Sequence, residues 1–62
     1  MMPSDNKAYL LRLARCAERE LAFRKRVYPR FVETGRMKAA EAQEEIESMA
    51  DIAEHFRSLA DG

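Results

Sequence analysis

Hydrophobic residues in the first half of the chain recur every three or four positions, which is the period of an amphipathic α-helix. The apolar row contains Leu10, Leu13, Ala17, Leu21, Tyr28 and Phe31. Ser4 or Asp5 can cap the first amides of this helix, and Gly35 suits a left-handed residue just beyond its end. The pattern therefore predicts a helix over residues 5–34.

Pro29 falls inside that predicted helix. Proline has no N–H to donate, and it disfavours the helical conformation of the residue before it, here Tyr28. Phe31 and Val32 nevertheless continue the apolar row in phase, so we expect a helix that kinks near residue 29 and resumes. A clean stop at Tyr28 is the alternative.

Hydrophobic residues in the second half follow alternating spacings of three and four, the signature of a heptad repeat. This row contains Ala39, Ala42, Ile46, Met49, Ala53, Phe56 and Ala60. It predicts a second helix over residues 38–60. The connection through Gly35, Arg36 and Met37 is short, which favours an antiparallel arrangement. We expect an all-α, two-helix hairpin that forms a single domain over residues 1–62.

Both helices carry more apolar surface than one neighbouring helix can cover. A second row lies beside the first, made by Tyr9, Cys16, Phe23 and Val27 in helix one and by Ile52 and Leu59 in helix two. A chain of 62 residues buries a small core, and a single cysteine cannot form an internal disulfide. We therefore expect a homodimer that forms a four-helix bundle. The alternative is that part of this row docks another protein.

Charge divides the chain into opposite halves. Residues 1–38 contain ten basic and four acidic residues, whereas residues 39–62 contain one basic and seven acidic residues. The halves carry net charges of +6 and −6. Five arginines share the outer face of helix one and are called the arginine ridge: Arg12, Arg15, Arg19, Arg26 and Arg30. The ridge is interpreted as a solvated face, as a surface for an acidic protein, or as a phosphate-binding surface.

Arg24 occupies a position in the apolar row where a hydrophobic residue is expected. Glu20 lies one turn earlier and predicts an ion pair that fixes the packing register, although Arg24 can instead recognise a partner. Cys16 is expected to be a small buried hydrophobic residue. His55 and the acidic residues of helix two are interpreted as solvated surface; those acidic residues are Glu44, Glu47, Asp51 and Glu54.

The sequence contains no motif typical of a catalytic, cofactor-binding or metal site, so we expect a protein that is not an enzyme and carries no cofactor. No apolar run approaches the roughly 20 residues that cross a membrane, and no signal peptide is apparent. A soluble protein of the cytoplasm, with no membrane partner, is the expected class.

The segment from Glu20 to Met37 resembles very small proteins of temperate phages and prophages of Gram-negative bacteria. Their pattern is E-L-x-x-R-x-x-V-Y-P-x-x-V-x-x-G-R-M, matched here through Glu20, Arg24, Tyr28 and Pro29, with Lys38 where many have Ser or Thr. In architecture the chain also resembles phage anti-activators of quorum sensing, which block a host transcription factor. The resemblance implies an accessory protein that binds and inhibits a host protein.

Two hypotheses for function follow. The first is a homodimeric hairpin, not an enzyme, that binds a host bacterial protein. Its partner-binding residues are expected to be Tyr9, Arg19, Phe23, Arg26, Val27, Tyr28 and Arg30. The alternative is a nucleic-acid-binding hairpin dimer, similar in size and architecture to the small plasmid RNA-binding protein that forms a four-helix bundle. In that alternative the arginine ridge contacts phosphates and Tyr28 or Phe23 stacks on a base.

Overall fold

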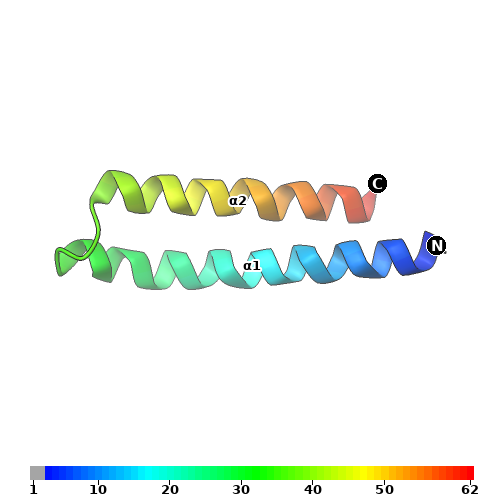
Figure 1. Ribbon diagram of the computed structural model, residues 1–62, viewed down its shortest axis with the longest axis horizontal. Coiled ribbons are helices and arrows are strands. Elements are labelled where there is room, and N and C mark those ends of the chain that lie inside the picture. Colours follow the sequence, from blue (N-terminus) through cyan, green and yellow to red (C-terminus); the bar gives the residue numbers. More distant parts are fainter. Residues whose placement is uncertain (1–2) are drawn as a thin grey trace.

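The computed structural model describes residues 3–62 and contains two antiparallel helices, α1 (Pro3–Glu33) and α2 (Ala39–Asp61) (Figure 1). Residues 34–38 form the loop at one end, and the start of α1 and the end of α2 lie at the other end. The hairpin measures 48 × 14 × 14 Å. The predicted all-α hairpin is confirmed, and the observed bounds of α2 lie within one residue of the predicted ones.

Helix α1 passes through Pro29 and ends at Glu33, so the alternative of a clean stop at Tyr28 is wrong. Proline leaves the carbonyl of Lys25 without its usual donor four residues later. Both Lys25 and Pro29 are exposed, so water can hydrate that carbonyl. The apolar side chains on either side of Pro29 keep the helix against α2 despite the lost hydrogen bond.

The start of α1 differs slightly from the prediction. The helix begins at Pro3, so Ser4 and Asp5 belong to its first turn and do not precede it. Proline is favoured at the first helical position because its missing N–H has no partner there in any case. The residue that precedes Pro3 lies outside the described part of the chain.

The end of α1 is a Schellman motif, in which two N–H groups beyond the helix donate back to its last carbonyls. Arg36 N–H donates to the carbonyl of Phe31 at 2.8 Å, and Gly35 N–H donates to that of Val32 at 3.1 Å. Gly35 adopts the left-handed conformation, with φ of +78°. The predicted role of Gly35 is therefore confirmed, and the reversal of the chain is fixed by backbone hydrogen bonds.

Replacing Gly35 by alanine is expected to destabilise the hairpin by about 1 kcal/mol, because a Cβ is strained at positive φ. A Cβ at this position meets no atom within 4 Å, so the cost comes from the backbone and not from a clash. Urea denaturation at fixed protein concentration measures the change. Gly35→Asn is the control, because asparagine tolerates this conformation better; an equal loss in both variants would contradict the explanation.

The start of α2 carries half of a capping box. The Glu41 carboxylate accepts a hydrogen bond from the N–H of Lys38 at 3.4 Å. The lysine side chain has no acceptor with which to return the contact. The first turn of α2 is therefore less well capped than one that begins with serine or threonine.

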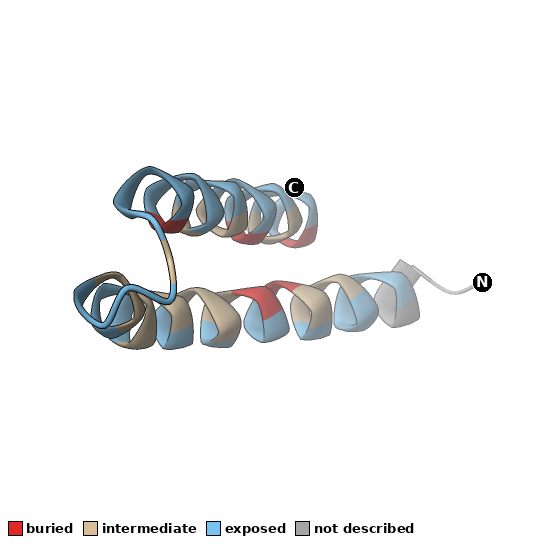
Figure 2. Ribbon diagram, turned by 60° about the vertical axis from the view of Figure 1, so that its left-hand side comes forward, coloured by how far each residue is buried: buried red, intermediate tan, exposed pale blue. Residues whose placement is uncertain are grey.

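The two helices meet along a seam of small residues. Ala14, Ala17, Ala42, Ala53 and Ala60 are buried, and in residues 6–62, whose side chains the structure describes, no larger side chain is buried (Figure 2). Larger seam residues such as Leu21 and Ile46 are only half-buried. Ala39 was expected in the seam but is exposed, because α2 begins there, where the chain is still leaving the loop.

Candidate protein-interaction surface

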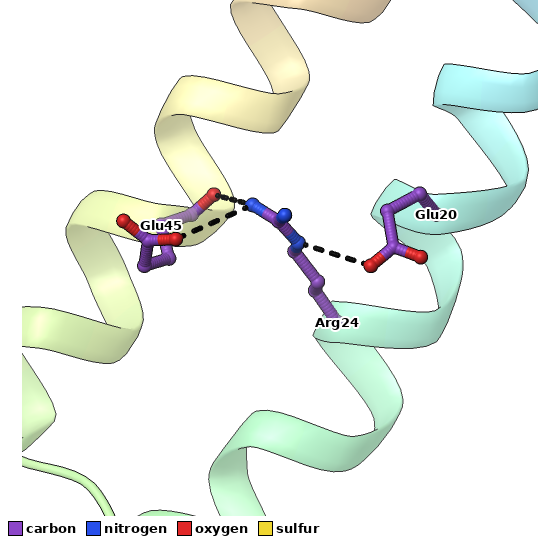
Figure 3. A network of polar contacts seen from close by, with 3 residues as sticks. All are labelled: Glu20, Arg24 and Glu45. Carbon is purple, nitrogen blue, oxygen red and sulfur yellow. Dashed lines mark hydrogen bonds and ion pairs between the residues drawn. The ribbon is translucent and has the colours of Figure 1, made fainter.

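Arg24 links the two helices through a network of polar contacts (Figure 3). Its Nε donates to the Glu20 carboxylate at 3.3 Å, which confirms the predicted pair. Its Nη1 crosses the seam, donates to the backbone carbonyl of Glu45 at 2.9 Å and lies 3.7 Å from the Glu45 carboxylate. Arg24 thus replaces a hydrophobic contact by three polar ones and fixes the register of α1 against α2.

A second ion pair, between Glu18 and Arg57, crosses the seam, and the sequence pattern did not predict it. Arg57 donates to both oxygens of the Glu18 carboxylate, at 2.8 and 3.0 Å, in a bidentate arrangement. These hydrogen bonds are the main reason that the pKa of Glu18 is lowered. Desolvation opposes them, and the positive charges of Arg57 and Arg15 add to the lowering. Arg57 is the only basic residue after position 38, and that isolation was the available signal.

The Glu18–Arg57 pair is expected to make the stability of the fold depend on pH. Because folding lowers the pKa of Glu18, the pair stabilises the fold above the ordinary glutamate pKa of 4.5 and stops doing so as the pH falls through the lowered value. The melting temperature of Glu18→Gln should therefore lie below that of the parent at pH 7, and the gap should close as the pH falls well below 4.5. Exposed Glu54 carries the control substitution, Glu54→Gln; a gap independent of pH would contradict the assignment.

The second apolar row remains uncovered in the hairpin, as predicted. Four of its large side chains are substantially exposed: Tyr9 by 51%, Phe23 by 44%, Ile52 by 44% and Leu59 by 47%. Val27 is half-buried. Together with Cys16 these residues are called the apolar face. Cys16 is exposed, so the prediction that it is a buried hydrophobic residue is wrong.

The apolar residues of both helices lie on the same side of the hairpin. Tyr9 and Cys16 each precede a seam residue of α1 by one position, and Ile52 and Leu59 precede Ala53 and Ala60 of α2 in the same way. In two antiparallel helices, the residues that precede a seam residue by one position point to the same side of the hairpin in both helices. The apolar face is therefore one continuous surface formed by both helices.

The two polar links across the seam agree with this geometry. Glu45 precedes the seam residue Ile46 by one position, so the Arg24 network lies on the side of the apolar face. Glu18 and Arg57 instead follow the seam residues Ala17 and Phe56, so their ion pair lies on the opposite side. The large exposed apolar side chains thus gather around the Arg24 network on one side of the hairpin, together with polar residues such as Glu41 and His55, whereas the Glu18–Arg57 pair lies on the other side.

The arginine ridge borders the apolar face along α1, and all five of its residues are exposed. Arg12 lies 5.3 Å from the ring centre of Tyr9, and Arg26 lies 5.8 Å from that of Phe23. These cation–π contacts hold the guanidinium groups over exposed rings. The border of the apolar face is therefore positively charged.

A groove of about 460 Å³ lies at the loop end of this border and is called the arginine groove. It is lined by Arg26, Val27, Arg30, Phe31, Thr34 and Arg36. Among the described side chains of residues 6–62, no carboxylate lies within ion-pair distance of its three guanidinium groups. The groove thus combines an apolar floor with uncompensated positive charge.

The structure places most of the predicted partner-binding residues on the apolar face or in the arginine groove. Tyr9, Phe23 and Val27 lie on the apolar face, whereas Arg26 and Arg30 line the arginine groove. Two others are placed differently. Arg19 is exposed on the ridge outside the groove, and Tyr28 is half-buried with its ring 5.8 Å from Arg24. Arg36 was missed, because a residue in a turn has no helical period that places it near the ridge.

The remaining candidates lie at exposed positions of α2. His55 is exposed, and its ring meets that of Phe56 edge-on at 5.4 Å. Glu44, Glu47, Asp51 and Glu54 are also exposed, as predicted. Over the described residues no three potential ligands gather closely enough to hold a metal ion. In the same part of the chain, neither helix has an apolar stretch that could span a membrane.

Comparisons with known proteins give no relative from which a function can be transferred. No family model, no curated protein and no solved structure matches this chain.

Proposed function

We propose that this chain is a protein-interaction module, not an enzyme, that forms a homodimer through its apolar face and binds another protein through its arginine ridge. The observation that carries the proposal is the exposure of Tyr9, Phe23, Ile52 and Leu59 on one side of the hairpin, between 44% and 51% each. Four large apolar side chains on one face of so small a chain are typical of an interaction surface.

Self-association would also compensate for the small hydrophobic core of the hairpin. The buried residues of the hairpin are alanines, which contribute little apolar area each. Small domains without a disulfide or a metal site usually gain their missing stability from a partner subunit. Two hairpins that meet through their apolar faces form a four-helix bundle in which these side chains become the core.

The arginine ridge supports a second role, binding to an acidic protein surface. Arg15 and Arg19 of the ridge are exposed on α1 outside both the apolar face and the arginine groove, so they stay accessible in the proposed dimer. The resemblance of residues 20–37 to small phage proteins leads us to propose a host regulator in the bacterial cytoplasm as the partner, and inhibition as the outcome. Nucleic acid is the alternative partner, which the seven acidic residues of α2 disfavour because they lie alongside α1.

The proposal is tested in two steps. Sedimentation equilibrium of the purified chain should give the mass of a dimer; a monomer at all accessible concentrations would contradict the role of the apolar face. The tagged chain should then capture a host protein from bacterial lysate in the presence of nuclease. Capture that is lost on nuclease treatment, with affinity that falls steeply with salt, would favour nucleic acid instead.

A matched pair of variants assigns the capture to the ridge. Arg15→Glu/Arg19→Glu reverses two charges on the ridge and should abolish capture of the host protein. Lys7→Glu/Lys25→Glu makes the same change in net charge at exposed positions of α1 outside the ridge and should leave capture intact. Equal losses in the two variants would show that capture reflects charge in general.

A further inference from the structure

We propose that the two copies in the homodimer pack with their loops at the same end, so that α1 of each lies beside α2 of the other. In this arrangement the partner subunit's Glu41 and Glu44 enter the arginine groove. The inference rests on the proposed self-association through the apolar face. It adds the topology of the bundle and the identity of the group that the groove holds.

Two symmetric arrangements bring the apolar faces of two hairpins together. A twofold axis parallel to the helices keeps both loops at the same end and places α1 against the partner's α2. A twofold axis perpendicular to the helices, within the interface, puts the loops at opposite ends and places α1 against the partner's α1. Both bury the same apolar residues, so hydrophobic contact alone does not choose between them.

Charge distinguishes the two arrangements. Helix α1 contains eight basic and four acidic residues, whereas α2 contains one basic and seven acidic residues. With the loops at opposite ends, the arginine ridges of two α1 helices lie side by side, and the acidic α2 helices do the same. With the loops at the same end, every interface joins helices of opposite charge. Like charges held along a contact are unfavourable, so the arrangement with the loops at the same end is preferred.

The arginine groove and the acidic residues at the start of the partner subunit's α2 provide a local match of opposite charges. Arg30 lies one turn before the loop in α1, and Glu41 lies within one turn after the loop in α2. Rotation about a twofold axis parallel to the helices leaves each residue at the same position along that axis. The partner subunit's Glu41 therefore lies level with Arg30. Glu41 also precedes the buried Ala42 by one position, which places it on the side of the apolar face.

Both acidic residues are available for this contact. Glu41 uses its Oε1 to accept from Lys38 N–H, which leaves Oε2 for a guanidinium group. Glu44 lies one turn further along the outer edge and is exposed. The groove offers the guanidinium groups of Arg26, Arg30 and Arg36 over the apolar Val27 and Phe31. Two carboxylates from the partner subunit therefore supply the charge that the groove lacks.

The distance between the two loops tests the topology directly. A nitroxide label at Glu33→Cys, in a Cys16→Ala background, marks the loop end of α1. Double electron–electron resonance should give a label separation of about 25 Å with the loops at the same end, against about 45 Å with the loops at opposite ends. A label at Ala22→Cys, near the middle of the hairpin, should give less than about 30 Å in both cases and controls for a folded dimer.

Charge reversal tests the groove. Arg30→Glu should raise the dimer dissociation constant about tenfold, since the contact occurs twice in the dimer. Arg15→Glu makes the same change in net charge on the ridge away from the groove and should change it less than about twofold. The double variant Arg30→Glu/Glu44→Arg should restore most of the affinity. Circular dichroism confirms that each variant keeps its helices.

The outcomes separate this inference from the proposed function. A dimer with the long separation, or a tighter dimer in Arg30→Glu, would overturn the topology and leave the homodimer standing. A chain that sediments as a monomer would overturn both. A short separation with no effect of Arg30→Glu would overturn the assignment of the groove.

Discussion

Glutamate in place of both Phe23 and Leu59 is expected to weaken the proposed homodimer by more than 100-fold. Burial of a large apolar side chain contributes roughly 1.5–3 kcal/mol, and the two substitutions remove four such side chains from a symmetric interface. They also place four carboxylates where the partner should exclude water. Sedimentation equilibrium measures the dissociation constant, and circular dichroism measures how much helix remains at each concentration.

The control for this double variant adds the same charges elsewhere. Ala22 and Ala40 are exposed and lie outside the apolar face, so Ala22→Glu/Ala40→Glu should leave the dissociation constant nearly unchanged. If the Phe23 and Leu59 double variant still formed a dimer of the parent's affinity, the interface would lie on another surface of the hairpin. A loss of helix at low concentration only would show that association and folding are coupled.

The second large effect is expected at Ala14, which has no exposed surface. A leucine there adds three carbon atoms between helices that approach closely along an alanine seam. Overpacking of this kind typically costs 1–3 kcal/mol, so Ala14→Leu should unfold at a clearly lower urea concentration than the parent. Ala22→Leu is the matched control because residue 22 is exposed on the same helix. Equal stability of the two variants would contradict the close seam.

Much of the fold could be predicted because local rules agreed with one another. The two helices followed from the spacing of apolar residues, the turn from Gly35, and the Arg24–Glu20 pair from their separation of one turn. Pro29 was the ambiguous element. Local geometry alone favours a stop at Tyr28, whereas the apolar row that continues through Phe31 favours a longer helix, and the packing prevailed.

The remaining details depend on contacts that sequence spacing does not specify. Alanine occurs both in seams and on surfaces, so the pattern could not separate buried Ala14 from exposed Ala39. Cys16 fits an apolar row equally well whether or not that row is covered. The Glu18–Arg57 pair and the arginine groove join residues whose relative height depends on how the loop sets the register of the helices. Such relations become visible only once both helices are placed.

The alanine seam has a consequence for how this protein persists in a cell. Because every side chain buried within residues 6–62 is an alanine, we expect the folded fraction to depend, through the proposed dimer, on how many copies are present. At low abundance, newly made chains would remain accessible to proteases. At concentrations above the dissociation constant of the dimer, association would protect them. The lifetime of the protein would then lengthen as its synthesis rate rises, so that a brief burst of expression leaves little behind.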